Sequence, residues 1–281
     1  GVAANRIARW DGTGWSALSG PNGNGTNSGV TALTVFDEDG DGPLPPALIA
    51  GGYFTTAGGV AVNRIAKWDG TGWSALSGPG GDGMNNSVRA LTVFDEDGDG
   101  PLPPALIAGG NFTTAGGVAA NRIARWDGTG WSALTGPSGN GIGSLFNSGV
   151  LALTVFDEDG NGPLPPALIA GGQFTAAGGV AVNNIAKWDG TGWSALTGPS
   201  GAVLALTVFD EDGDGPLPPA LIAGGQFITA GGVAVNRIAK WDGTGWSALS
   251  GPNGNGTNSG VTALTVFDED GDGPLPPALI A

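Results

Sequence analysis

The chain has 281 residues, of which 25 are acidic and 10 are basic, so its formal net charge is −15. This balance repels phosphate backbones and anionic lipid surfaces, so we expect no nucleic-acid partner. The chain contains neither Cys nor His, which excludes disulfides, thiolate metal sites and an imidazole general base. No apolar run approaches the ~20 residues of a membrane-spanning helix, so membrane insertion is not expected.

One segment of the chain recurs five times. GVAANRIARWDGTGWSAL at residues 1–18 returns, with small changes, at Gly59, Gly117, Gly179 and Gly232. The starts lie 58, 58, 62 and 53 residues apart, and subtracting one connecting loop of 11, 11, 15 or 6 residues leaves 47 each time. Near-identical units that cannot each bury a core predict one cooperative array, so we expect a single domain over residues 1–281.

Each repeat predicts four short strands. Residues 30–37 (VTALTVFD) alternate and are rich in β-branched residues, and the acidic DEDGDG turn and PLPP end this first strand. ALIAGGYF at residues 47–54 is apolar on both sides, as in a strand buried between layers. After the TTAGG turn, residues 62–70 predict a third strand, and the Asp-Gly hairpin leads to a fourth at residues 72–76. No segment predicts a helix.

Four antiparallel strands per repeat are typical of a propeller blade, and a β-solenoid is the alternative. The chain opens with a third and fourth strand and closes with a first and second strand. The sequence therefore predicts an all-β fold, a five-bladed β-propeller of four-stranded antiparallel blades, whose last blade is closed by both termini. The blades are expected at residues 30–76, 88–134, 150–196 and 203–249, and at 261–281 completed by 1–18.

The tandem AGGxFTTAGGVAxNxIAxWDGTGWSAL motif with VxALTVFD resembles bacterial secreted β-propellers with recently amplified, near-identical blades, of a planctomycete-like kind. The resemblance covers the whole chain, and the five-bladed closure is similar in architecture to tachylectin-type propellers. It implies an extracellular or cell-surface location, with any export signal outside residues 1–281. Residues 1–50 and 232–281 differ only at Ala4 against Val235 and Arg9 against Lys240, which recent duplication or deliberate repeat engineering would each produce.

The acidic turns are candidate calcium sites. Asp37-x-Asp39-x-Asp41-Gly42 has the spacing that places alternate carboxylates around a hard cation, and it resembles the Ca²⁺ hairpins of integrin-type propellers. Pro45 stands where those hairpins carry a ninth-position Asp. The alternative is a solvated turn whose Asp side chains bond their own backbone, with no cofactor. The candidate ligands are Asp37, Asp39, Asp41, Asp95, Asp97, Asp99, Asp157, Asp159, Asn161, Asp210, Asp212, Asp214, Asp268, Asp270 and Asp272.

Differences between the copies point to a candidate ligand-binding surface, because a symmetric ring needs no differences. After the Gly-Gly pair the copies carry Tyr53, Asn111, Gln173 and Gln226, at the mouth of the turn that faces the variable loops. Amide, Gly and aromatic residues suit adaptable, low-charge recognition such as that of sugars. Neutral drift in exposed loops explains the variation equally well.

Catalysis is not expected, because nearly every acid is a repeated copy in an outer turn, whereas glycosidases use two carboxylates in unlike environments. The ten Trp flank the Asp-Gly hairpins, where cross-strand packing is expected rather than a binding array. The sequence thus predicts a monomeric, non-catalytic recognition or adhesion module whose partner is a glycan or an extracellular protein. The alternative function is a structural spacer or an engineered symmetric scaffold with no specific ligand.

Overall fold

The computed structural model describes residues 3–40, 42–98, 100–143, 149–160, 162, 164–213, 217–252, 254–269 and 277–281. Every regular element among these residues is a β-strand, so the predicted all-β class is confirmed. The described part of the chain contains no helix that could cross a membrane. The chain forms two compact units, one of residues 1–95, 100–135 and 140–142 and the other of residues 96–99, 136–139 and 143–281. The single domain stays a prediction.

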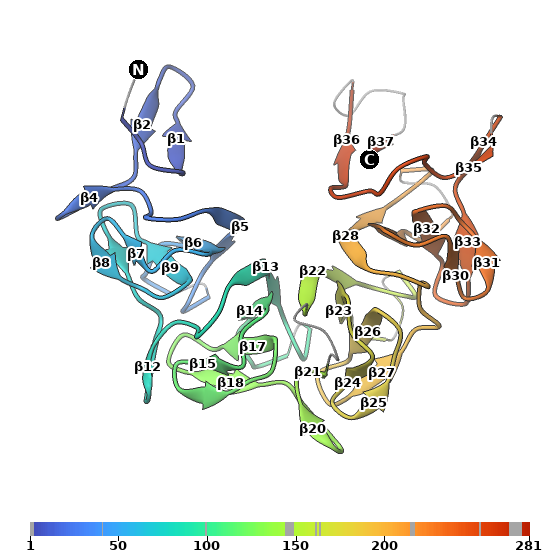
Figure 1. Cartoon of the computed structure of the whole chain (residues 1–281), viewed down its shortest axis with the longest axis horizontal. Helices are drawn as coiled ribbons and strands as arrows, with labels where there is room; N and C mark the ends of the chain where they lie inside the picture. The colour runs from blue at the N-terminus through green and yellow to red at the C-terminus, as the bar shows by residue number, and fades with distance from the viewer. Residues whose placement is uncertain are drawn as a thin grey trace. The chain divides into compact units, whose positions relative to one another are not determined.

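Four sheets repeat one four-stranded antiparallel pattern in which the strands follow chain order across the sheet (Figure 1). The first unit contains β5 (Val30–Phe36), β6 (Ala47–Gly52), β9 (Ile65–Trp68) and β10 (Trp73–Ser74), then β13 (Val88–Phe94), β14 (Ala105–Gly110), β17 (Ile123–Trp126) and β18 (Trp131–Ala133). The second unit contains β22 (Val150–Phe156), β23 (Ala167–Gly172), β26 (Ile185–Trp188) and β27 (Trp193–Ala195), then β28 (Val203–Phe209), β29 (Ala220–Gly225), β32 (Ile238–Trp241) and β33 (Trp246–Ala248). The predicted four strands per repeat are confirmed.

Two further sheets have only two strands each. β1 (Ala8–Trp10) pairs with β2 (Trp15–Ala17), and β36 (Thr265–Phe267) pairs with β37 (Ala278–Ile280). In sequence, β1 and β2 correspond to the third and fourth strands of a complete sheet, whereas β36 and β37 correspond to the first and second.

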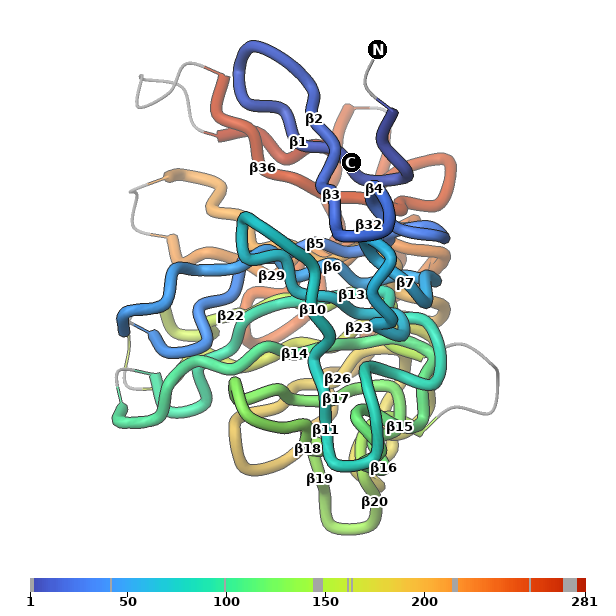
Figure 2. The backbone as a smooth tube through the Cα atoms, turned by 90° about the vertical axis from the view of Figure 1, so that its left-hand side faces the viewer, coloured from blue at the N-terminus to red at the C-terminus, as the bar shows by residue number. Residues whose placement is uncertain are grey.

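The connections contain short hairpins that the sequence analysis did not predict. Those in the loops between sheets are β3–β4 (Ser19–Gly20, Gly23–Asn24), β11–β12 (Ser77–Gly78, Gly81–Asp82), β19–β20 (Thr135–Gly136, Gly139–Asn140) and β34–β35 (Ser250–Gly251, Gly254–Asn255). β12 lies in a narrow projecting loop in Figure 1, and Figure 2 labels β11, the other strand of this hairpin. Those in the TTAGG turns are β7–β8 (Thr56–Ala57, Val60–Ala61), β15–β16 (Thr114–Ala115, Val118–Ala119), β24–β25 (Ala176–Ala177, Val180–Ala181) and β30–β31 (Thr229–Ala230, Val233–Ala234), with β21 (Ile142–Gly143) beside β24.

A β-bulge interrupts the first strand of each complete sheet. The pairing of β5 with β6 shifts between Val30 and Ala32, and the same shift recurs in β13, β22 and β28. The bulge falls at Thr31, Arg89, Leu151 and Leu204, one per sheet. A bulge leaves one residue out of the ladder and re-aims its side chain.

The cores lie between successive sheets of each unit. In the first unit, Trp126 and Trp131 pack against Phe36, Ile49 and Leu76 of the preceding sheet. In the second unit, Trp241 and Trp246 pack in the same way against Phe156, Ile169 and Leu196. The second strand of each complete sheet is buried almost throughout, as its apolar sequence predicts. Because each fully buried Leu, Ile or Phe side chain contributes about 1.5–3 kcal/mol, the stability of a sheet depends on its neighbour.

Candidate functional site

The four variable residues after the Gly-Gly pairs are anchored in the same way. The N–H of Tyr53 donates to the carbonyl of Gly29 at 2.9 Å, and the N–H groups of Asn111, Gln173 and Gln226 donate to the equivalent carbonyls at 2.9, 3.2 and 2.8 Å. The side chains of Tyr53, Gln173 and Gln226 are exposed, and Asn111 is half-buried. Tyr53 and Asn111 belong to the first unit, and Gln173 and Gln226 to the second. The four residues thus share one backbone position, and three of their unlike side chains face solvent.

Tyr53 has a cationic partner that the sequence analysis missed. The guanidinium carbon of Arg89 lies 4.8 Å from the centroid of the Tyr53 ring, within the range of a cation–π interaction. Arg89 occupies the bulge of β13, whereas Thr31 at the bulge of β5 donates its hydroxyl to the carbonyl of Val88 at 2.7 Å. The signal was present in the sequence, because this position varies between the copies as Thr31, Arg89, Leu151, Leu204 and Thr262.

Gln226 borders a recess of about 570 Å³, which is also lined by Ser200, Phe227, Ile228, Thr229 and Arg237. Ile228 is 58% exposed there, in place of the Thr that the other copies carry. The backbone of Arg237 has a φ of 70°, a left-handed conformation that costs an L-residue roughly 1–2 kcal/mol. Its guanidinium Nη1 donates to the carbonyl of Thr257 at 3.5 Å, so Arg237 connects the recess to the following loop.

In the first, third and fourth acidic turns, Asp side chains bond their own backbone. Asp37 Oδ1 accepts the N–H of Asp39 at 3.3 Å, and Asp39 Oδ2 accepts the N–H of Leu44 at 3.0 Å. Asp157 and Asp159 repeat this pattern in the third turn, with Leu164 as the second donor at 3.1 Å. These contacts are those of the self-stabilised turn that the sequence analysis gives as the alternative to calcium.

Several candidate calcium ligands lie outside the described residues, namely Asp41, Asp99, Asn161, Asp214, Asp270 and Asp272. The described candidates are Asp37, Asp39, Asp95, Asp97, Asp157, Asp159, Asp210, Asp212 and Asp268. No group of three acidic residues suited to a metal ion occurs within the described ranges. Calcium binding by the complete turns stays a prediction.

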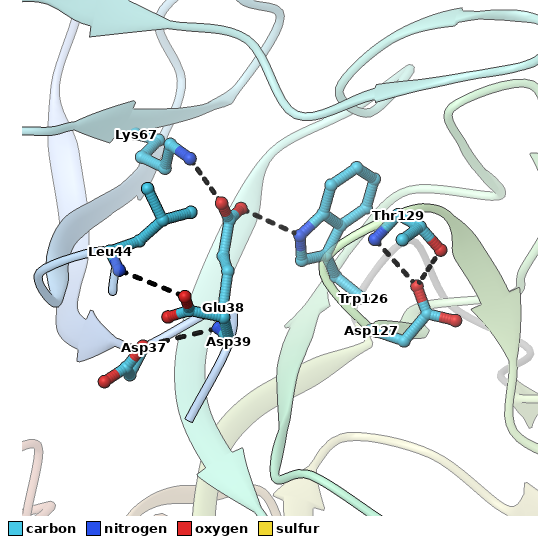
Figure 3. A network of polar contacts seen from close by, with 8 residues as sticks. All are labelled: Asp37, Glu38, Asp39, Leu44, Lys67, Trp126, Asp127 and Thr129. Atoms are coloured by element: carbon cyan, nitrogen blue, oxygen red, sulfur yellow. Dashed lines mark hydrogen bonds and ion pairs between the residues drawn. The ribbon is translucent and has the colours of Figure 1, made fainter. Parts of the chain in front are cut away.

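The Glu of the first acidic turn links two successive sheets. Figure 3 shows Glu38 between Lys67 of its own sheet, with which it forms an ion pair, and Trp126 of the next. The indole N–H of Trp126 donates to Glu38 Oε1 at 3.3 Å. In the second unit, Glu158 pairs with Lys187 at 2.5 Å and Glu211 with Lys240 at 2.7 Å. These carboxylates are occupied by structural partners, so the arrangement favours no catalytic role for them.

The Asp of each WDGTG hairpin holds its turn. The Thr13 hydroxyl and the N–H groups of Thr13 and Gly14 all donate to Asp11 Oδ1, which lowers the pKa of that carboxyl to about 2. Hydrogen bonds from the equivalent Thr and Gly also lower the pKa of Asp69 and Asp242. Burial opposes the shift at Asp127 and Asp189, yet the hydrogen bonds lower the pKa of both. Such carboxyls stay ionised at neutral pH and are poor general acids.

The Trp residues form five cross-strand pairs. Their ring centroids lie 5.2–5.5 Å apart and the ring planes are tilted by 51–55°. Trp73, Trp126, Trp131, Trp188, Trp193, Trp241 and Trp246 are buried. Packing is therefore their role in the complete sheets, as the sequence analysis expects.

Comparisons with protein-family models, with curated proteins and with solved structures gave no match.

Proposed function

We propose that this chain is a non-catalytic recognition module that closes into a five-bladed β-propeller and binds a glycan or an extracellular protein through its variable residues. The observation that carries the binding proposal is the pairing of Tyr53 with Arg89, an exposed aromatic ring beside a cation at two positions that vary between the repeats. The proposal places the module outside the cell, in keeping with the sequence resemblance.

Closure into a ring is supported by uncovered apolar surface on each unit. In the first unit, Trp10 and Trp15 are 52% and 60% exposed. In the second unit, Phe209 and Leu249 are only partly buried, whereas Phe36 and Leu76 at the same repeat positions are 2% exposed. Within each unit, a Trp pair packs against the Phe and Leu of the preceding sheet. In the proposed ring, Trp10 and Trp15 would pack against Phe209 and Leu249 in this way. The hairpins β36–β37 and β1–β2 would together form the fifth blade.

The chemistry at Tyr53 favours a glycan with an acidic or strongly polar substituent. Arg89 covers one face of the ring, and Tyr53 as a whole is 43% exposed, which leaves apolar ring surface for stacking. The guanidinium offers several N–H donors in a planar fork that matches a carboxylate or a sulfate. In a chain of net charge −15, a cation on a ligand-facing surface also lowers the repulsion of an anionic ligand.

In the proposed ring, Tyr53, Asn111, Gln173 and Gln226 lie on one rim, so that a branched ligand contacts several of them at once. Each contact is weak, and their combination gains affinity through avidity. The recess beside Gln226 supports this proposal, because it offers Ser200, Thr229 and Arg237 as further hydrogen-bonding groups.

Binding to a glycan array that includes uronic-acid, sialylated and sulfated glycans tests the proposal. We expect binding by the wild-type chain, a loss of about tenfold or more for Tyr53→Ala, and a smaller loss for Arg89→Lys, which keeps the charge but not the planar fork. Leu44→Ala is the matched control, because Leu44 is 56% exposed and lies in an acidic turn.

A spacer or an engineered scaffold predicts a different result. The wild-type chain would bind no glycan and no protein ligand. Tyr53→Ala, Arg89→Lys and Leu44→Ala would all behave like the wild type. Binding that survives replacement of Tyr53, Asn111, Gln173 and Gln226 by Ala would place the recognition surface elsewhere.

A further inference from the structure

In the first three complete sheets, the hairpin in the loop ahead of the sheet covers the TTAGG turn of that sheet. The N–H of Asn22 in the first hairpin donates to the carbonyl of Gly58 at 3.2 Å. The same bond joins the second and third hairpins, at 2.9 and 3.2 Å, to the carbonyls of Gly116 and Gly178. All three of these turn glycines are buried.

A glycine of each hairpin lies directly against the turn that the hairpin covers. A Cβ added to Gly20 would lie 2.4 Å from the carbonyl oxygen of Gly58, and one added to Gly78 or Gly136 would lie 2.5 or 2.4 Å from the equivalent oxygen. Only glycine, which has no Cβ, allows this approach. The three hairpins share the pattern Ser/Thr-Gly-Pro-x-Gly-Asn/Asp, at residues 19–24, 77–82 and 135–140.

The fourth turn has no such hairpin, because the loop ahead of its sheet, residues 197–202, has six residues where the first loop has eleven. We call residues 228–234 the bare turn. Gly231 is exposed, and its carbonyl accepts no hydrogen bond in the described part of the chain. Apart from its chain neighbours, no described atom lies within 4 Å of a Cβ built on Gly232. The loop and the bare turn both lie between strands of complete sheets, so the missing hairpin is a property of this repeat.

A buried indole beside the bare turn has lost its acceptor. The indole N–H of Trp73 donates to the carbonyl of Leu18, just ahead of the first hairpin, at 3.1 Å, and Trp131 makes the equivalent bond at 3.2 Å. The Nε1 of Trp246 is buried and has no partner among the described residues. A Cβ on Gly231 would lie 3.0 Å from Trp246 Cδ1, so this indole borders the bare turn. Buried donors without acceptors are rare and destabilising, which favours a ligand that supplies the acceptor.

Apolar side chains are exposed in the same turn. Val233 is 40% exposed, whereas the equivalent valines of the covered turns are half-buried, namely Val60, Val118 and Val180. Ile228 is 58% exposed at a position where the other copies carry Thr. The shortened loop and the change from Thr to Ile thus fall in one place, and together they favour a contact surface rather than a solvated turn.

We propose that the bare turn binds a Ser/Thr-Gly-Pro-x-Gly-Asn/Asp hairpin carried by a partner protein. The glycine of that hairpin passes close to the Gly231 carbonyl, and the N–H two residues later donates to this carbonyl. The carbonyl just ahead of the hairpin accepts the indole N–H of Trp246. This is recognition through main-chain groups, with specificity from a glycine where a side chain would collide. The proposal goes beyond the glycan site and requires neither that site nor ring closure.

The probe is a disulfide-closed peptide with the sequence of residues 19–24, SGPNGN, between two cysteines, titrated into the ¹⁵N-labelled full-length chain. The closed ring holds the peptide in its bound shape and so lowers the entropic cost of binding. We expect saturable NMR shifts of the amides of Gly231 and Gly232 and of the Trp246 indole N–H. The same peptide with Ala in place of its first Gly should not bind, because the added Cβ meets the Gly231 carbonyl.

An insertion variant locates the binding. Insertion of Gly-Pro-Asn-Gly-Asn after Thr197 gives this loop eleven residues and restores the hairpin, which then competes for the bare turn at high effective concentration. We expect the peptide to bind about tenfold more weakly or worse. Insertion of Ala-Pro-Asn-Gly-Asn is the matched control, because a loop of equal length that lacks the glycine cannot occupy the turn, and it should leave the peptide affinity unchanged. Both variants must retain the amide dispersion of the wild type, which establishes that they fold.

Absence of saturable shifts at millimolar peptide would overturn the proposal, as would equal binding of the Gly and Ala peptides to the wild-type chain. Neither result depends on the folding of a variant. Shifts of Gly231 and Gly232 on dilution of the chain alone would mean that a second copy covers the turn, which would also overturn it. The glycan array is unaffected by any of these results, so failure here is distinguishable from failure of the proposed function.

Discussion

The hairpin β9–β10 and the hairpin β1–β2 share the sequence RIAxWDGTGWSAL, yet their surroundings differ. Both have the same register, with Trp opposite Trp, and their ring centroids lie 5.3 and 5.5 Å apart. Trp73 is 5% exposed inside a complete sheet, whereas the equivalent Trp15 is 60% exposed. The comparison separates two levels of structure: residues within the hairpin set its shape, and the preceding sheet sets its burial.

Removal of residues 1–18, which contain the β1–β2 hairpin, should have the largest effect on stability and association. Ile7 and Leu18 pack in one cluster with Phe54, Val62 and Trp73, and the carbonyl of Leu18 accepts the indole N–H of Trp73 at 3.1 Å. The deletion would uncover the first sheet and, in the proposed ring, leave a blade with unpaired edges. We expect aggregation or concentration-dependent association by size-exclusion chromatography with light scattering. A monomeric product with the wild-type Tm would rule out ring closure.

Trp73→Ala and Trp15→Ala compare the two hairpins directly. Loss of a buried Trp typically costs about 3–5 kcal/mol, which we expect for Trp73→Ala in urea unfolding. If the ring closes as proposed, Trp15 gains a partner and Trp15→Ala should cost within about 1 kcal/mol of the same amount. A negligible effect of Trp15→Ala would mean that its ring stays in water.

Acid should weaken both hairpins through their turn carboxylates. The pKa of Asp11 is about 2 and that of Asp69 is lowered from its usual 3.8, so their contribution to stability is present above pH 4. It is lost as the pH falls through the lowered values, because the folded state binds the protons less readily than the unfolded state. We expect the Tm to fall between about pH 4 and pH 2. Asp→Asn at the five WDG turns should flatten the dependence of the Tm on pH. An unchanged dependence would contradict its assignment to these carboxylates.

Thr71→Val and Thr13→Val test whether hydrogen bonds within the turn determine its stability equally in both hairpins. Each change removes the hydroxyl that donates to the turn Asp, at 2.8 Å in one hairpin and 2.7 Å in the other. We expect each variant to lower the Tm by about 2–4 °C in thermal melts followed by circular dichroism. Unequal shifts would mean that the surroundings, and not the turn alone, determine its strength.

Divalent cations should produce the smallest shift. In the turns of Asp37, Asp157 and Asp210 the Asp side chains already accept backbone N–H groups, so we expect a few millimolar Ca²⁺ and Mg²⁺ to raise the Tm by the same small amount through screening. A larger shift with Ca²⁺ that disappears in Asp39→Asn and its four equivalents would instead establish calcium sites in the complete turns. The turn of Asp157 should then be the weakest, because Asn161 replaces its third Asp.

The strands were predictable from the sequence because their signals are local. Alternation over Val30–Phe36 and the unbroken apolar run over Ala47–Gly52 each identify a strand within one repeat. The β3–β4 hairpin was not predictable in this way, since it is held against the following turn, where the N–H of Asn22 donates to the carbonyl of Gly58. Such a contact spans dozens of residues and leaves no periodic pattern.

The candidate site was predictable only in part. The exposure of Tyr53, Gln173 and Gln226 agrees with the expectation drawn from variation between the copies. The sequence alone does not single out Arg89, because it lies in a strand, where side chains are expected to pack. The bulge that frees its side chain depends on pairing with β14, which composition does not reveal.

The near-identity of the first strands has a consequence for how the chain reaches its native state. β5, β13, β22 and β28 share the sequence ALTVF, and their partners share ALIAGG, so any first strand could pair with any second strand at almost equal energy. Only the distance along the chain favours the native strand pairing, because the entropic cost of closing a loop rises slowly with the length of the loop. Refolding from denaturant should therefore populate mispaired traps and exchanged dimers, and synthesis from one end, which presents one repeat at a time, should avoid them.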